Sequence, residues 1–330
     1  MAILAGDIGG TKTLLQLSEP INGGFEVLYE KRYPSADYSE FLPLANDFVE
    51  DALKHTNIQA KAACFGIAGP VNGRTGGTTN LPWRLDADQL ERVLDIPHVR
   101  LINDFQSVGY GIEVLKDNDI VTLQEGVEIP NSTRIVIGAG TGLGQGFLVW
   151  QDDHYEVVAS EGGHADFAPT DDLQIELLQY LRKQYRWPTW ERVVSGRGLV
   201  NIFEFLASRP SASISAELQK ALELEDHAAA VSRFGLADQD PIATQALDLF
   251  TKIYGAQAGN FALVGLATGG VYVAGGVAPK IISKLQDGTF MEAFMDKYER
   301  MHPLLKAMPV KVVINEHVGL LGSAVAASRL

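Results

Sequence analysis

Two glycine-rich segments, each directly after an apolar run, carry the most informative chemistry in this sequence. The first is G-D-I-G-G-T at residues 6–11, and the second is G-A-G-T-G-L-G at residues 138–144. Glycine allows a sharp backbone turn and lets an anion come close to main-chain N–H groups. Each segment is followed by another strand-like run, so each predicts the tip of a β-hairpin. Two such tips predict a pair of loops that bind one polyphosphate.

Neither segment has the pattern of the two common nucleotide-binding motifs. G-x-x-x-x-G-K-[ST] does not occur, so a P-loop is not supported. No G-x-G-x-x-G leads from a strand into a helix near the N-terminus, which argues against a Rossmann dinucleotide site. Residues 145–150, which follow the second segment, have the composition of a strand and lack a helical stripe. For either segment alone, a tight hairpin without a ligand is the alternative.

Polar side chains also follow two apolar strands. Asn103 and Asp104 come directly after the strand predicted at residues 99–102, and open α/β sheets bind ligands at such strand ends. The alternative for Asp104 is the N-cap of the next helix. Glu161 and His164 follow another strand and enclose two glycines, which let the backbone fold tightly and bring the two side chains together.

A third polar candidate is Glu191, which follows Trp190 in a predicted helix. Taken alone it is an ordinary solvated residue of a first helical turn.

Hydrophobic periodicity predicts the strands and helices that must position these groups. Strands are predicted at residues 3–8, 13–18, 25–33, 62–68, 99–102, 134–137, 146–151, 156–160, 271–274 and 310–315. Helices are predicted at residues 38–56, 86–94, 105–115, 171–184, 191–206, 242–265, 279–286 and 318–329. Residues 209–240 lack a periodic pattern and predict a peripheral excursion.

Bulk properties narrow the class of protein. A chain of 330 residues predicts two domains, and the formal net charge of −14 argues against nucleic-acid or anionic-membrane partners. The single cysteine, Cys64, excludes an intrachain disulfide and a multi-cysteine zinc site. The N-terminus has too few apolar residues for a secretory signal, which predicts a cytoplasmic protein. Residues 253–279 carry no charge, but their glycines predict a buried helix and strand rather than a membrane span.

Eight motifs in a fixed order identify a family resemblance. They are G-D-I-G-G-T (6–11), F-G-I-A-G-P (65–70), T-N-L-P-W (79–83), I-N-D-F (102–105), G-A-G-T-G-L-G (138–144), E-G-G-H-A-D-F-A-P (161–169), E-R-V-V-S-G-R-G (191–198) and G-G-V-Y-V-A-G-G-V (269–277). The chain resembles bacterial glucokinases of the hexokinase–actin–Hsp70 ATPase superfamily along essentially its whole length. The resemblance implies an α/β fold of two actin-like (ribonuclease H-like) domains, with mixed sheets flanked by helices and the active site in the interdomain cleft. The small domain would hold residues 1–114 plus 317–330, and the large domain residues 115–316.

The resemblance also implies the reaction and the residues that carry it. The γ-phosphoryl group of ATP would pass to the 6-hydroxyl of glucose, with Asp104 as the catalytic base. The sugar-binding residues would be Asn80, Asn103, Asp104, Glu161, His164 and Glu191. The ATP-binding residues would be Gly6, Asp7, Ile8, Gly9, Gly10, Thr11, Gly138, Ala139, Gly140, Thr141, Gly275 and Gly276. Asp7 would orient Mg²⁺ through water, as carboxylates often do for this ion.

Some features separate this chain from its relatives and leave alternatives open. Lys12 stands where many relatives have asparagine, and it could contact phosphate or simply be solvated. The related repressor, open-reading-frame and kinase (ROK) family usually carries a histidine–cysteine zinc cluster, which a chain with Cys64 alone cannot form. A homodimer is implied by the resemblance only. The alternatives are a kinase for mannose or an N-acetylated sugar, a sugar-sensing regulator, and a non-catalytic ATPase. A sugar-sensing regulator is disfavoured because it would need a DNA-binding helix-turn-helix ahead of the first loop, and none precedes Asp7.

Overall fold

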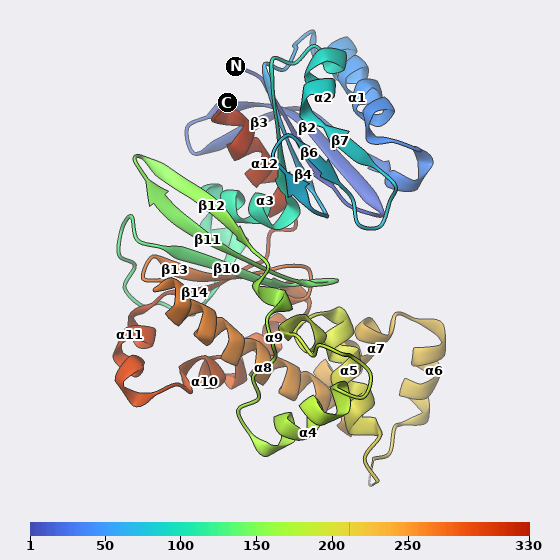
Figure 1. Cartoon of the computed structure of the whole chain (residues 1–330), viewed down its shortest axis with the longest axis vertical. Coiled ribbons are helices and arrows are strands. Elements are labelled where there is room, and N and C mark those ends of the chain that lie inside the picture. The colour runs from blue at the N-terminus through green and yellow to red at the C-terminus, as the bar shows by residue number, and fades with distance from the viewer. Residues whose placement is uncertain (211) are drawn as a thin grey trace. The chain divides into compact units, whose positions relative to one another are not determined.

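The computed structural model describes residues 1–210 and 212–330, which form two compact units of mixed α/β structure (Figure 1). The first unit comprises Met1–Asp119, Trp150–Ala159 and Asn315–Leu330, and the second comprises Ile120–Val149 and Ser160–Ile314. The segment 150–159 therefore groups with the first unit, which the sequence did not predict. The functional domain boundaries inferred above stay a prediction.

The first unit is built on a five-stranded sheet in the order β3-β2-β1-β4-β8. The strands β1, β4 and β8 run parallel, whereas β2 and β3 are antiparallel additions at one side. A small antiparallel sheet, β5-β6-β7, is attached. The strands are β1 (Ile3–Ile8), β2 (Lys12–Ile21), β3 (Gly24–Pro34), β4 (Ala62–Ile67), β5 (Val71–Asn72), β6 (Thr75–Gly77), β7 (Arg84–Asp86) and β8 (His98–Asn103).

Helices cover both faces of this sheet (Figure 1). The helices α1 (Phe41–Thr56) and α2 (Ala87–Leu94) contribute Phe48 and Leu90 to a core with Leu4 and Leu17 of the strands. The helices α3 (Asp104–Gly111) and α12 (Val318–Ser328) cover the other face, and Ser323 Oγ of α12 donates to Gly6 O of β1 at 2.9 Å. The parallel strands thus have α3 and α12 directly beside their carboxyl ends. Short 3₁₀ turns lie at Ser35–Asp37, Ile112–Val114 and Asp117–Asp119.

The second unit is built around a six-stranded sheet in the order β12-β11-β10-β13-β14-β9. Its strands are β9 (Ile120–Gln124), β10 (Arg134–Ala139), β11 (Leu143–Gln151), β12 (His154–Ser160), β13 (Gly270–Ala274) and β14 (Val310–Val313). The end of β11 from Trp150 and all of β12 up to Ala159 group with the first unit. Its helices are α4 (Asp172–Leu181), α5 (Gly196–Ala207), α6 (Ala216–Leu224), α7 (His227–Leu236), α8 (Pro241–Gly265), α9 (Ile282–Leu285), α10 (Thr289–Met295) and α11 (His302–Ala307). Short 3₁₀ turns are η4 (Gly162–His164), η5 (Trp190–Arg192), η6 (Ala278–Ile281) and η7 (Glu299–Met301).

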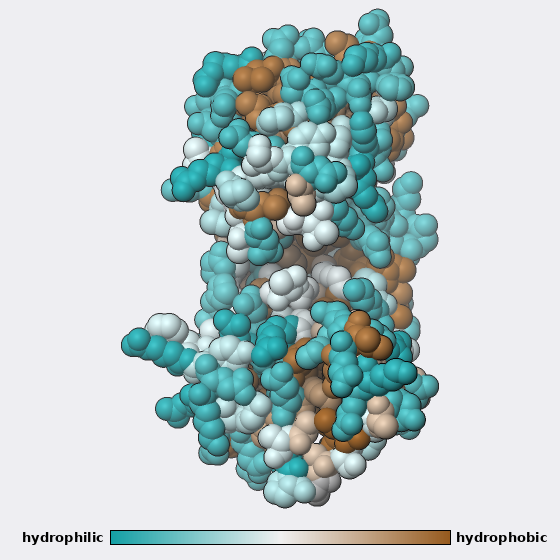
Figure 2. Space-filling model, turned by 90° about the vertical axis from the view of Figure 1, so that its right-hand side faces the viewer, coloured by the Kyte–Doolittle hydropathy of each residue, from teal (hydrophilic) through white to brown (hydrophobic). Residues whose placement is uncertain are grey.

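The uncharged stretch 253–279 is the buried helix and strand that the sequence predicts. It contains the second half of α8, most of which is buried, and all of β13, each residue of which is buried. Over residues 1–210 and 212–330, no helix combines the length and the apolar character that crossing a bilayer requires. The face drawn in Figure 2 is mostly hydrophilic, with hydrophobic residues in small scattered groups.

The structure corrects several element predictions. The segment 209–240 is not without regular structure, because α6 and α7 lie in it, with Ser215 and Asp226 as their N-caps. Residue 211 lies outside the described residues. The helix predicted at 191–206 begins only at Gly196, after Ser195 accepts a hydrogen bond from Gly198 N as its N-cap. The helix predicted at 279–286 is a 3₁₀ turn followed by one short α-helical turn.

Candidate active site

Both glycine segments are hairpin tips, as the sequence predicts. In the first unit β1 and β2 pair antiparallel up to Ile8 and Thr13, and Gly9 N donates to Lys12 O at 3.0 Å across the turn. In the second unit β10 and β11 pair up to Ala139 and Leu143, and Gly140 N donates to Gly142 O at 2.8 Å. Both loops are therefore tight, glycine-rich turns. Such turns suit the binding of phosphate.

The first loop lies beside two of the predicted site residues. An added Cβ on Gly10 would lie 3.0 Å from Cβ of Asn80, so Asn80 packs directly on this loop. Asp7 is the last residue but one of β1, and its carboxylate lies near Gly319 in the first turn of α12. A carboxylate is favourable at a helix N-terminus because the peptide dipoles present positive charge there. A small pocket of about 20 Å³ beside Asp7 is lined by Asp7, Lys12, Leu14, Arg32, Glu316 and His317.

Asn103 and Asp104 lie at the same edge of the sheet as the first loop. The parallel register aligns Ile8 of β1 with Ile67 of β4, and Ile67 with Asn103 of β8. Because neighbouring strands are about 4.8 Å apart, Ile8 and Asn103 are separated by roughly 10 Å across the sheet. Asp104 is the first residue of α3, directly after β8. The strand ends therefore bring Asp104 to the edge that carries the first phosphate loop.

The helix cap at this position is Asn103 and not Asp104. Asn103 Oδ1 accepts from Phe105 N at 2.9 Å, and Gln106 Oε1 accepts from Asn103 N at 3.2 Å, which completes a capping box. The amide of Asn103 is further fixed because its Nδ2 donates to Gly69 O at 3.1 Å. Asp104 Oδ1 accepts one hydrogen bond from Phe105 N at 2.9 Å. Asp104 is thus not needed as the N-cap, and its carboxylate has capacity for another partner.

The surroundings of Asp104 make it more basic than an ordinary aspartate. The pKa of Asp104 is raised to about 6: burial is the main cause and the nearby carboxylate of Asp7 contributes, against the lowering effect of the hydrogen bond from Phe105 N. Burial also raises the pKa of Asp7, against the lowering effect of Lys12 and His317. A carboxylate with a pKa near 6 is ionised at neutral pH and still basic enough to accept a proton from a hydroxyl group.

Hydrogen bonds with α8 and with the segment after β13 hold the backbone of the second loop at Ala139. Ala139 N donates to the hydroxyl of Tyr254 at 3.2 Å, and the same hydroxyl donates to Ile137 O at 3.3 Å. Burial raises the pKa of Tyr254, so the hydroxyl stays protonated and can donate. Val277 N donates to Ala139 O at 3.1 Å, which places Gly275 and Gly276 directly beside the loop. The sequence did not point to Tyr254, because a tyrosine in an apolar helix has no distinguishing pattern.

Glu161, His164 and Glu191 lie together in the second unit, close to the second loop. Glu161 Oε2 is 3.8 Å from His164 Nε2, as the two intervening glycines predict. Glu191 Oε2 accepts from Leu143 N at 3.3 Å, at the end of the loop. The turns that carry these residues are side by side, because Trp190 N donates to Ala165 O at 3.0 Å.

Packing holds this cluster in place. The rings of Phe167 and Trp190 meet edge to face with centroids 5.3 Å apart. The backbone of Gly163 lies against Leu143, and that of Gly162 lies over the side chain of Gln145. The Nε2 atom of Gln145 is buried and makes no hydrogen bond. The second unit therefore gathers Glu161, His164 and Glu191 around the start of β11.

The predicted site residues fall into two groups, one in each unit. The first unit brings together the loop 6–11, Asn80, Asn103 and Asp104, and the second unit brings together the loop 138–141 with the others, Glu161, His164, Glu191, Gly275 and Gly276. Arg32, Glu316 and His317 beside Asp7 were not predicted. No motif pointed to them, because they come from strand and turn segments that only the fold brings to β1.

Comparisons with known proteins identify the family of this chain. The family model described as Glucokinase matches residues 4–330. The glucokinase of Nostoc punctiforme is 45% identical to the chain, and the match covers 99% of each protein. The glucokinase of a Synechocystis strain is also 45% identical, and the match covers 99% of this chain and 98% of that protein. Among solved structures, a glucokinase from an Antarctic psychrotroph has a TM-score of 0.88 and 28% identity, with 100% of this chain and 99% of that chain covered. A glucokinase from Balamuthia mandrillaris in complex with glucose has a TM-score of 0.80 at 21% identity, with 100% and 94% covered, and shows the same fold. The chain belongs to the glucokinase family.

Proposed function

We propose that this chain transfers the γ-phosphoryl group of ATP to the 6-hydroxyl of glucose, with Asp104 as the general base. The observation that carries the proposal is the placement of a partly buried carboxylate, with a pKa raised to about 6, at the strand edge that bears a phosphate-type loop. Membership of the glucokinase family supports the reaction and the hexose substrate. Phosphoryl transfer depends mainly on positioning and charge stabilisation, so a single well-placed general base is the only acid–base group that the reaction requires of the protein.

Asp104 acts by accepting the hydroxyl proton as the new P–O bond forms. Its carboxylate is ionised at neutral pH and accepts a hydrogen bond from Phe105 N through Oδ1, and the two carboxylate oxygens offer further lone pairs for the sugar hydroxyl. Asn103, fixed by its three hydrogen bonds, would hold a neighbouring hydroxyl group. The amide of Asn103 cannot swing away, which favours a single orientation of the sugar.

The second unit carries further candidate ligands for sugar and phosphate. Glu161, His164 and Glu191 offer acceptors and donors for hexose hydroxyls, and a site of such groups rejects analogues that lack a hydroxyl. The loops at 6–11 and 138–141 supply N–H groups for the ATP phosphates. Gly275 packs against Ala139 of the second loop, and Gly276, where an added Cβ would meet nothing within 4 Å, leaves open space for the adenosine.

The residues around the first loop fit a magnesium ion that arrives with ATP. Residues 1–210 and 212–330 contain no cluster of three or more His, Cys, Asp or Glu side chains suited to hold a metal alone. Mg²⁺ usually keeps several waters and takes one or two carboxylates plus substrate phosphates, which matches a lone Asp7 at the loop. When bound, the ion neutralises charge on the phosphates. Asp7, partly buried beside the N-terminus of α12, would present its carboxylate to the ion or to its waters.

Removal of divalent metal should abolish activity only until magnesium is restored. The donor set around Asp7 suits a hard, oxygen-seeking ion, and Cys64 is a buried free thiol that cannot contribute to a multi-cysteine zinc site. Activity is measured after EDTA treatment and readdition of MgCl₂ or ZnCl₂. Recovery with zinc but not with magnesium would overturn this part of the proposal.

The pH dependence should show one acidic limb that belongs to Asp104. Because burial raises the pKa of Asp104 to about 6, kcat/KM should fall about tenfold per pH unit below that value, as the base becomes protonated. Ionisation of the buried carboxylate also costs stability. The contribution of Asp104 to the free energy of unfolding should therefore fall as the pH rises from about 4 to 6. A kcat/KM profile that stays flat down to about pH 4.5 would contradict this assignment.

Sugar specificity is tested by a coupled assay over glucose, mannose, N-acetylglucosamine and 2-deoxyglucose. The proposal expects the largest kcat/KM for glucose, and a higher value for mannose or the N-acetylated sugar would assign the chain to another hexose.

The same proposal includes a role as a transferase in glycolysis, a cytoplasmic location and assembly as a homodimer. The formal net charge of −14 supports the absence of nucleic-acid and anionic-membrane partners.

A further inference from the structure

Gln106 in the first turn of α3 has both ends of its side-chain amide engaged. Its Oε1 accepts from Asn103 N at 3.2 Å, and its Nε2 donates to Val157 O at 3.2 Å. Val157 lies on β12, 51 residues further along the chain. One side chain therefore joins the backbone directly before Asp104 to the backbone of the β11–β12 hairpin.

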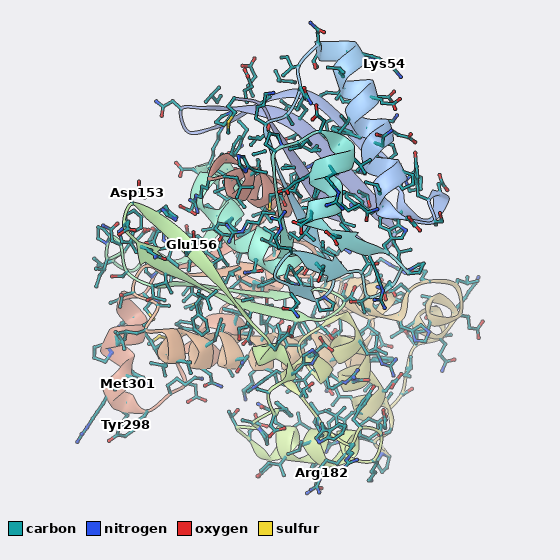
Figure 3. The ribbon with its side chains drawn as sticks, turned by 45° about the horizontal axis from the view of Figure 1, so that its top comes forward. Lys54, Asp153, Glu156, Arg182, Tyr298 and Met301 are labelled. Atoms are coloured by element: carbon teal, nitrogen blue, oxygen red, sulfur yellow. The ribbon has the colours of Figure 1, made fainter. Side chains whose placement is uncertain are left out.

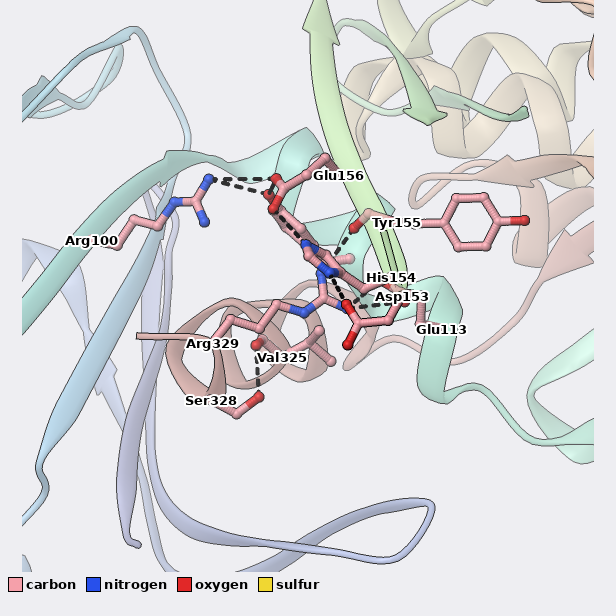
Figure 4. A network of polar contacts seen from close by, with 10 residues as sticks. Arg100, Glu113, Asp153, His154, Tyr155, Glu156, Val325, Ser328 and Arg329 are labelled. Atoms are coloured by element: carbon pink, nitrogen blue, oxygen red, sulfur yellow. Dashed lines mark hydrogen bonds and ion pairs between the residues drawn. The ribbon is translucent and has the colours of Figure 1, made fainter. Parts of the chain in front are cut away.

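The hairpin that provides this carbonyl is itself firmly held within the first unit. Figure 4 shows the network: Arg329 donates to Tyr155 O at 2.8 Å and to both carboxylate oxygens of Glu113 at 2.9 Å. The hydroxyl of Tyr110 donates to Glu156 at 2.6 Å. Figure 3 shows Glu156 and Asp153 on this hairpin. These contacts tie the hairpin to α12 and to the second half of α3.

Close packing at Gly109 adds to these polar contacts. A Cβ added to Gly109 of α3 would lie 2.6 Å from Cγ1 of Val157, a residue that is 5% exposed. The strand β12 thus lies directly against α3, with no space between them for a methyl group. The carbonyl of Val157 is consequently a fixed acceptor, and the hydrogen bond from Gln106 transmits its position to Asn103.

The chain connectivity gives this hydrogen bond a consequence for the reaction. Val157 precedes Glu161 by four residues on the strand that leads to it. On the other side, Gln106 contacts the N–H of Asn103, the residue directly before Asp104. Gln106 thus connects, through two hydrogen bonds, the strand leading to one sugar ligand with the turn that carries the base.

We propose that Gln106 is a positioning residue for phosphoryl transfer: by bridging Asn103 N and Val157 O, it fixes the Asn103–Asp104 turn against β12. This inference rests on the proposed function, in which Asp104 is the base. Because displacement of reacting groups by about 1 Å can cost 10²-fold in rate, loosening this turn should lower kcat about tenfold to hundredfold. Gln106 touches no substrate in this proposal and acts only through Asn103 and Asp104.

The competing explanation is that Gln106 only caps α3. Glutamate fills the third helical position of a capping box as well as glutamine does. Gln106→Glu would keep an acceptor for Asn103 N, but it would have no donor for Val157 O. If capping were the only role, Gln106→Glu would therefore retain kcat, whereas Gln106→Ala would lose stability alone. If Gln106 positions the turn, both variants lose kcat.

The chain offers a matched control for cap loss. Gln174 occupies the same position in α4, where its Oε1 accepts from Thr170 N at 3.2 Å next to the N-cap Asp171. Gln174→Ala should lower the melting temperature and leave kcat close to that of the wild type. Gln106→Ala should lower the melting temperature similarly and lower kcat in addition. Turnover is measured at a temperature at which every variant is fully folded by circular dichroism.

In the Gln106→Glu variant, the pH profile of kcat distinguishes a displaced Asn103–Asp104 turn from the electrostatic effect of the added carboxylate. A glutamate at 106 adds a carboxylate near Asp104 and should shift the acidic limb of kcat to higher pH. At about pH 8 and above, where Asp104 is ionised in either case, a remaining tenfold loss reports position alone. A Gln106→Glu enzyme with the kcat of the wild type at this pH would overturn the inference.

A second variant approaches the same contact from α3 without touching Gln106. Gly109→Ala forces β12 away from α3 through the side chain of Val157 and should reduce kcat, and Gly109→Ala combined with Val157→Ala should recover part of it. Wild-type kcat in Gly109→Ala would contradict the coupling. Failure of the proposed function is distinguishable, because it would appear as activity retained in Asp104→Asn, whatever the Gln106 variants do.

Discussion

Replacement of Asp104 by asparagine should remove most of kcat while glucose still binds. The variant keeps the size of the side chain and an acceptor for Phe105 N, but it cannot take up a proton. General-base contributions are typically 10²- to 10⁴-fold, and we expect a loss of kcat in or beyond that range. Asn103, Glu161 and His164 remain to hold the sugar, so the dissociation constant for glucose, measured by calorimetry, should change little.

The stability of the same variant gives an independent readout. Because burial raises the pKa of Asp104, the charged carboxylate is costly in the folded state, and its removal should leave the melting temperature unchanged or raised at about pH 8. Asp86 provides the matched control, since its Oδ1 caps α2 by accepting from Asp88 N at 2.9 Å and Gln89 N at 3.1 Å. Asp86→Ala should cost about 1 kcal/mol of stability and leave turnover intact.

The two explanations of Asp104 therefore differ in both measurements on one preparation. Loss of turnover without loss of stability identifies a base. An Asp104→Asn enzyme that melts lower and phosphorylates glucose at nearly the wild-type rate would remove Asp104 from the mechanism.

Substitution of Gly275 by alanine should weaken ATP binding severely. Gly275 has φ +82°, in the left-handed region, and an added Cβ would lie 2.5 Å from Ala139 O at the second loop. The left-handed conformation costs an alanine about 1 to 2 kcal/mol, and the steric overlap must in addition displace the backbone of the loop. We expect KM for ATP to rise about tenfold or more, with kcat reduced as well, because the phosphates lose their alignment.

Gly288 offers the control for backbone strain alone. It also has a left-handed φ, +103°, but the nearest atom to an added Cβ is Glu292 Oε1 at 3.9 Å. Gly288→Ala should therefore lower the melting temperature without changing KM for ATP. If Gly275→Ala bound ATP as the wild type does, the second loop would have no role in holding phosphates.

The parts of the site that the sequence predicts are those formed by neighbouring residues. The hairpin tips at 6–11 and 138–144 depend on glycines between two apolar runs, and the Glu161–His164 pair depends on the two glycines between its members. Asp104 was predicted at a strand end because β8 is a short apolar run followed directly by polar residues. Local sequence decides such features, so local reasoning finds them.

Features that depend on distant contacts or on single capping residues were missed. The grouping of segment 150–159 with the first unit depends on Arg329, 174 residues away from Tyr155. The helices α6 and α7 are short, and the caps at Ser215 and Asp226 that begin them are single residues in a stretch without strong periodicity. The β5-β6-β7 sheet has strands of only two or three residues, which are too short to show alternation.

The helix α12 affects the order in which the protein can fold during synthesis. Ser323 of α12 donates to Gly6 O in the first strand and lies 3.3 Å from Ser107 Oγ of α3, so this late helix completes the face of the sheet beside Asp104. At 5 to 20 residues per second, a ribosome adds the stretch between α3 and α12 in roughly 10 to 40 s. During that interval β1 and α3 exist with an uncovered apolar face, whereas Ile120–Val149 and Ser160–Ile314 can already assemble. The first unit, although it begins the chain, therefore cannot complete its fold until α12 has been synthesised.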